Sequence, residues 1–168
     1  MYSEFAEFCK QVVPQKAYWK DGELWTALIG GVGSFIWFQC DGEVIGLIRQ
    51  NFGDLLNIVG IIFGFVLAAL VFYIEAASNW ADKDNVQKVA DMIIDRHVWT
   101  VLCLLLLIGV ILLVWVLGRY VSRIDWLNCL LHSFLVFGFL YCGFQVFNHV
   151  LTVWWHFRNR KRFRDENR

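Results

Sequence analysis

The residues best able to do chemistry lie along one face of the last apolar segment. They advance by four, three, four, three and four positions, so in a helix they share one narrow face. This polar stripe consists of Gly138, Cys142, Gln145, His149, Thr152 and His156. Polar groups in a lipid-embedded helix turn towards protein or water. The stripe therefore indicates either interhelical hydrogen bonds or the lining of a polar pathway.

A second regularly spaced set is made mostly of small residues. It follows the same helical spacing and consists of Asn57, Gly60, Gly64, Ala68, Val71 and Glu75. Small side chains allow the backbone of another helix to approach closely. The first four members therefore predict a helix-packing seam, either within one chain or between subunits.

Glu75 brings a carboxylate to the edge of this apolar segment, where it is costly unless it reaches water or a partner. His149 and His156 are predicted to lie towards the same leaflet. Histidine gains charge near physiological pH, so we consider Glu75 and His149 a candidate pair whose contact would strengthen in acid. The alternative is that Glu75 simply reaches interfacial water.

Other chemistry finds little support in the sequence. His97 and His149 are predicted to lie on two helices towards the same side of the membrane, so they could both ligate one haem. No haem-attachment motif accompanies them. No phosphate loop, nucleophile elbow or zinc-protease motif is present. The five cysteines are odd in number and form no C-x-x-C pair, which argues against a disulfide framework or a zinc site. We expect a protein that is not an enzyme, with no catalytic residue, metal ligand or cofactor.

The segments that position these residues are unusually apolar. Hydrophobic residues make up 58% of the chain, above the 45–50% or so of a soluble domain. Four stretches carry no charged side chain, and they reach or approach the roughly 20 residues that cross a bilayer. The sequence predicts an all-α integral membrane bundle with spans at about 24–40, 55–74, 98–118 and 130–151. The first is short and rich in glycine, so a re-entrant segment is its alternative.

The polar flanks predict the orientation. We expect a cytoplasmic N-terminal segment over 1–23 with an amphipathic helix at 3–13 and a basic cytoplasmic tail over 158–168. Between them we expect a cytoplasmic loop over 76–97, which contains a short amphipathic helix capped by Asp84. These three flanks hold twelve lysines and arginines, against three in the other two loops. The positive-inside rule then places both termini in the cytoplasm of a multi-pass protein of the inner (plasma) membrane.

The charge balance bears on partners. The formal net charge is zero, which gives no reason to expect a nucleic-acid partner. Anionic lipid headgroups lie beside the basic tail. The 76–97 loop and this tail are the segments that a cytosolic protein partner would meet.

The stretch from Asn57 to Leu70, NIVGIIFGFVLAAL, resembles a segment of small four-span bacterial membrane proteins that belong to antiphage defence systems, such as the Kiwa membrane subunit. The resemblance covers one helix and the four-span layout. It implies a homo-oligomeric membrane component that senses infection or alters membrane permeability. The alternatives are an accessory subunit of a larger respiratory or transport complex and a haem-binding electron-transfer subunit.

Overall fold

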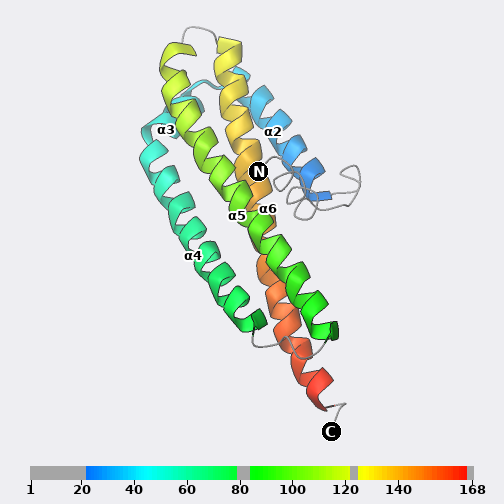
Figure 1. The fold of residues 1–168 in the computed structure, drawn as a ribbon. Coiled ribbons are helices and arrows are strands. Elements are labelled where there is room, and N and C mark those ends of the chain that lie inside the picture. The colour runs from blue at the N-terminus through cyan, green and yellow to red at the C-terminus, as the bar shows by residue number, and fades with distance from the viewer. Residues whose placement is uncertain (1–21, 79–83, 122–124, 166–168) are drawn as a thin grey trace, which may run out of the picture.

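The computed structural model describes residues 22–78, 84–121 and 125–165, and every secondary-structure element in these ranges is a helix. The helices are α2 (Gly22–Cys40), α3 (Glu43–Gln50), α4 (Phe52–Ser78), α5 (Asp84–Val121) and α6 (Asp125–Asp165), as Figure 1 shows. The prediction of an all-α protein is confirmed for this part of the chain. The amphipathic helix predicted at 3–13 lies outside the described residues.

In the described part of the chain, three helices are long and apolar enough to cross a membrane. Their candidate spans are Phe52–Glu75, Ile93–Gly118 and Asp125–Leu151. The spans predicted at 55–74, 98–118 and 130–151 fall inside them, because a stretch without charge of about 20 residues already matches the thickness of the hydrocarbon core. The chain is therefore consistent with a membrane protein.

The first predicted span forms a helix, α2, but it is not among these three candidates. Glu23 and Gln39 lie near its two ends, and four glycines dilute its apolar character. By length and composition, α2 is therefore not identified as a fourth membrane-spanning helix. The 19 residues of α2 would measure about 28 Å, so their length alone permits a crossing.

The 76–97 segment differs from its prediction as a separate amphipathic helix. The helix does begin at Asp84, but it continues without a break through the span as far as Val121. No proline or glycine occurs between Asp84 and Ile108 to interrupt it. Ile93 is buried, so packing holds the junction in place. Residues 76–78 belong to the end of α4.

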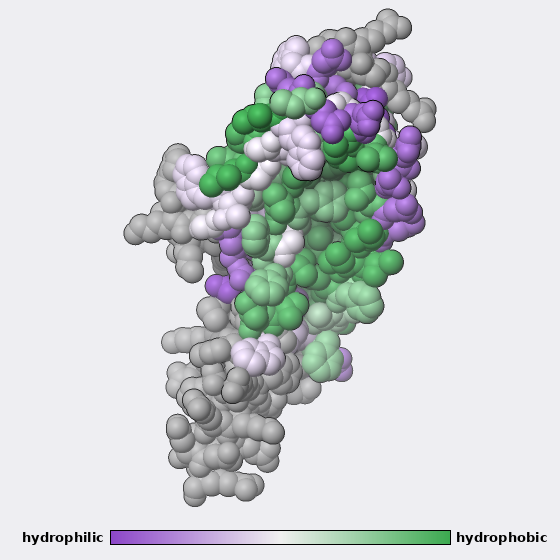
Figure 2. Space-filling view, turned by 180° about the vertical axis from the view of Figure 1, so that it is seen from behind, coloured by the Kyte–Doolittle hydropathy of each residue, from purple (hydrophilic) through white to green (hydrophobic). Residues whose placement is uncertain are grey.

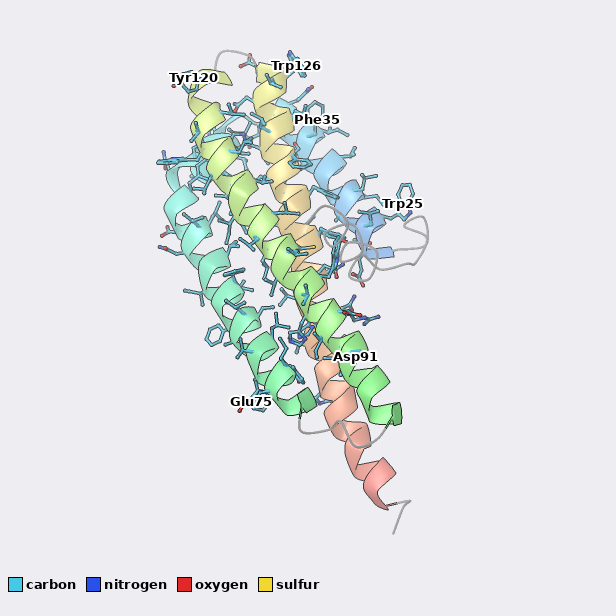
Figure 3. All side chains as sticks on the ribbon, viewed as in Figure 1. Trp25, Phe35, Glu75, Asp91, Tyr120 and Trp126 are labelled. Carbon is cyan, nitrogen blue, oxygen red and sulfur yellow. The ribbon has the colours of Figure 1, made fainter. Side chains whose placement is uncertain are left out.

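The helices contact one another in the spatial order α2, α6, α5, α4. Neighbours in this row run in opposite directions, and α2 covers only part of the length of α6 (Figure 1). The short helix α3, the end of α5 and the start of α6 lie at one end of the bundle, which we call the Arg49 end. The opposite end carries the labelled residues Glu75 and Asp91 (Figure 3), and we call it the Glu75 end.

The core forms where α4, α5 and α6 meet. Its buried side chains include Val59, Leu104, Leu107, Ile111 and Leu135.

The outer surface is also apolar. Large side chains such as Ile29, Phe65, Leu106 and Phe147 are more than 60% exposed, and Figure 2 shows apolar residues covering much of the middle of one face. A water-soluble monomer rarely exposes so much contiguous apolar surface, whereas hydrocarbon chains would solvate it.

Candidate functional site: the polar contacts of α6

The polar stripe of α6 lies partly against α5. The imidazole rings of His149 and His97 are in contact, with their centroids 3.3 Å apart and their planes at 80°. Seven residues earlier on α6, the Sγ atom of Cys142 donates to the carbonyl oxygen of Cys103 at 3.3 Å. Because six residues separate the two partners on α5, these contacts follow one antiparallel register along the α5–α6 seam.

The two histidines are deeply buried and incompletely hydrogen-bonded. His97 is 0% exposed and His149 is 7% exposed. Nδ1 of His97 lies 3.1 Å from the carbonyl oxygen of Ile93, so Nδ1 carries the proton and Nε2 becomes an acceptor. That Nε2 and Nδ1 of His149 are both buried without a hydrogen-bond partner among the described residues. The ring of Tyr73 covers His97 from α4, at a centroid distance of 4.9 Å.

This arrangement bears on the haem alternative. Ligation by two imidazoles needs the iron to lie between the rings, and rings in direct contact leave no room for it. Within the described residues, no group of three or more histidine, cysteine, aspartate or glutamate side chains is placed to hold a metal ion. Imidazole is the side chain whose charge changes near neutral pH once it reaches water, so the chemistry that these two residues offer is a change of charge rather than metal binding.

Gln145, although it belongs to the same stripe, faces a different helix. Its Nε2 donates to Oε2 of Glu23 in the first turn of α2, at 3.0 Å. The stripe is thus divided between two neighbours, with Cys142 and His149 against α5 and Gln145 against α2. The side chains of Thr152 and His156 lie outside the described part of the structure.

Glu75 is exposed at the end of α4. Figure 3 shows it on the side of α4 that faces away from α5 and α6. The α4 residue that reaches the histidines is Tyr73, and the group in contact with His149 is His97. An approach of Glu75 to His156 falls outside the described side chains.

Glycines on α2 and α6 mark two close helix–helix approaches. A Cβ atom added at Gly31 would lie 3.0 Å from Cβ of Phe137 and 3.6 Å from the backbone oxygen of Ser133 on α6. A Cβ added at Gly138 would lie 3.0 Å from Cδ1 of Leu107 on α5. The sequence analysis did not single out Gly31, since nothing in the spacing of the α2 glycines showed which helix would cover them.

The predicted helix-packing seam on α4 faces outwards. Asn57, Gly60, Gly64 and Ala68 are all exposed, and a Cβ atom added at either glycine would meet nothing within 4 Å. The inward side of α4 instead carries larger residues, including Val59 and Val66. These four residues, which we call the α4 face, pack against no other helix among the described residues of one chain.

A contact that the sequence analysis missed closes the Arg49 end. The Nη2 atom of Arg49 donates two hydrogen bonds, one to the carbonyl oxygen of Gly118 at 3.0 Å and one to Oδ1 of Asn128 at 2.6 Å. Gly118 lies in the last turn of α5, where helix carbonyls lack partners and a positive charge is favourable. Arg49 therefore joins α3 to α5 and α6. The only sequence signal was a single arginine after an apolar turn.

Nδ1 of His132 approaches the carbonyl oxygen of Asn128 at 2.8 Å, which places a third buried histidine beside the Arg49 contact.

No protein-family model matches the chain, and neither a curated protein nor a solved structure matches it significantly. The resemblance of the 57–70 segment to membrane proteins of defence systems accordingly stays an expectation from the sequence.

Proposed function

We propose that this protein is a non-enzymatic membrane component that works as a homo-oligomer, with copies associating through the α4 face. The observation that carries the proposal is that Asn57, Gly60, Gly64 and Ala68 are exposed together on a helix apolar enough to span a membrane. Small residues allow two helices to pack closely in lipid, where apolar burial gives little driving force. The amide of Asn57 adds a hydrogen-bonding group that prefers protein to hydrocarbon.

The proposed cellular role is that of an antiphage defence effector or sensor that alters membrane permeability, as the resemblance of the 57–70 segment suggests. The packing supports an assembly as the active form. Between the polar contacts at the two ends, Leu104, Leu107, Ile111 and Leu135 fill the core of one chain. A single closed bundle therefore offers ions no polar route, and a change of permeability requires several copies or a movement of the helices.

The assembly is tested by replacing Gly64 with leucine. The added side chain should force the partner helix away and reduce the assembly to single copies, while the fold of each chain is kept because nothing lies within 4 Å of that site. The measurement is the mass of the protein in detergent, by light scattering corrected for bound detergent.

Gly109→Leu is the matched control, since Gly109 is an exposed glycine of α5 with nothing within 4 Å. An assembly that survives Gly64→Leu, or one that Gly109→Leu disrupts equally, would exclude the α4 face as the interface.

We further propose four crossings, with α2 as the additional span, and both termini on the cytoplasmic side of the inner membrane. The supports are the length of α2 and the excess of lysine and arginine in the 1–23, 76–97 and 158–168 segments. Reporter domains fused at Met1 and Arg168 should both report the cytoplasm. Opposite locations for the two ends would mean that α2 does not cross.

A further inference from the structure

The contact between His97 and His149 is unusual for a structural pair. Buried polar atoms normally have hydrogen-bond partners, yet each ring here keeps a buried nitrogen with none among the described residues. Both residues are more than nine-tenths buried, and they come from different helices. We propose that His97 and His149 form a pH-sensitive joint, which holds the Glu75 end of the α5–α6 seam closed while both rings are neutral and opens it when a ring takes up a proton.

The groups around the joint do not favour a charged ring. From α4, the neutral ring of Tyr73 faces His97, and Glu75 lies two residues further on, exposed. On α5, the positive charge of Arg96 acts on His149.

Two neighbouring side chains complete the surroundings. Asp95 is partly buried on α5, two residues before His97, and the neutral Asn148 precedes His149 on α6. Among the described residues, neither unpartnered ring nitrogen has a carboxylate within hydrogen-bonding distance.

A proton on either ring would therefore create a buried charge without a counter-ion. Such a charge is strongly unfavourable in apolar surroundings, and charges on both rings would repel each other at contact distance. A state in which the rings reach water would accept the proton freely. The proton acts here as a ligand, and a ligand favours the state that binds it better. Lowering the pH therefore favours the open state.

The size of the effect follows from the ordinary behaviour of an exposed imidazole, which titrates near pH 6.5. Suppose that the closed state takes up no proton and the open state exposes both rings. Lowering the pH from about 7.5 to about 5.5 then raises the ratio of open to closed chains about tenfold for one histidine and about a hundredfold for two.

The rest of the structure confines the opening to one end. At the Arg49 end, Arg49 ties α3 to α5 and α6. Cys142 and Cys103 hold the middle of the seam. The hydrogen bond from Gln145 to Glu23 marks the start of α2, so α2 does not extend to the level of His149 (Figure 1).

The joint lies within a single chain and does not depend on the proposed assembly. A failure of one proposal is therefore distinguishable from a failure of the other.

The test measures the separation of α5 and α6 with spin labels, in lipid nanodiscs. Cys9 and Cys40 are first replaced by serine, while the buried Cys103, Cys129 and Cys142 are kept. One labelled protein carries Asp91→Cys and Leu151→Cys, two exposed positions at the Glu75 end. We expect the longer distances to become more populated at pH 5.5 than at pH 7.5.

A second labelled protein, with Tyr120→Cys and Trp126→Cys, serves as the control. Both residues are exposed at the Arg49 end (Figure 3), and their label distances should not change with pH.

Phenylalanine at both histidines keeps an aromatic ring but removes the titrating group. The pH response should disappear in the double variant His97→Phe and His149→Phe. If helix content shows that the double variant does not fold, His149→Phe alone should reduce the response from about a hundredfold to about tenfold. Distances that are identical at both pH values, or a full response that persists in the phenylalanine variants, would overturn the proposal.

Discussion

Replacing Gly31 with leucine should be among the most damaging single changes in the described part of the chain. A Cβ atom at this position already lies 3.0 Å from Cβ of Phe137 and 3.7 Å from its Cα, so a larger side chain has to push α2 away from α6. Overpacking of this kind costs about 1–3 kcal/mol. The expected result is a lower free energy of unfolding. It is measured by unfolding the protein, held in mild detergent micelles, with increasing amounts of a denaturing detergent.

Gly33→Leu provides the matched control for this experiment. Gly33 belongs to the same helix, and an added Cβ would meet nothing within 4 Å, so its replacement should change stability little. Equal effects of the two substitutions would show that α2 does not pack on α6 through Gly31.

Replacing Arg49 with alanine should also strongly destabilise the fold. The change removes the hydrogen bonds to the Gly118 carbonyl and the Asn128 side chain. Hydrogen bonds made by a charged group contribute about 1.5–3 kcal/mol, so the free energy of unfolding should fall by at least about 2 kcal/mol. Gln50→Ala, at an exposed neighbouring position of α3, is the control.

A double-mutant cycle separates the contact itself from other effects of losing Arg49. If Arg49 and Asn128 interact as in the structure, the losses from Arg49→Ala and Asn128→Ala should sum to more than the loss in the double variant. Additive losses would mean that the two side chains do not interact.

Sequence reasoning located α4, α5 and the apolar part of α6 because the thickness of a bilayer sets a length that can be counted in uncharged residues. It was less successful at junctions. The polar residues between Asp84 and His97 suggested a separate helix. In the structure one helix runs from this polar segment into the apolar span, because no residue at the junction breaks it. A short, glycine-rich segment such as α2 falls near the limit of what composition can decide.

Helical spacing shows which residues share a face, but it does not show which helix covers that face. The spacing predicted close packing at Gly64 and did not single out Gly31, yet among the described residues it is Gly31 that has a close neighbour on another helix. For the same reason, the polar stripe of α6 could not reveal that Gln145 faces α2 while Cys142 faces α5. The identity of a partner depends on the register between helices, which the sequence does not encode locally.

The two histidine arrangements predict opposite responses to acid. A pair between Glu75 and His149 would strengthen as the imidazole gains a positive charge, because the carboxylate attracts it. The ring contact between His97 and His149 would weaken, because no carboxylate in the described part of the chain meets their unpartnered nitrogens. A shortening of the distance between α5 and α6 labels at pH 5.5 would therefore favour an acidic partner over the joint.

If this membrane component acts as an assembly of identical chains, the mass of the wild-type protein extracted in native lipid, without denaturing detergent, will show it. One chain has a mass of 19.7 kDa, so we expect a particle whose protein mass is two or more times that value and contains this polypeptide alone. A particle that holds one copy, whether by itself or with a different membrane protein, would contradict the claim.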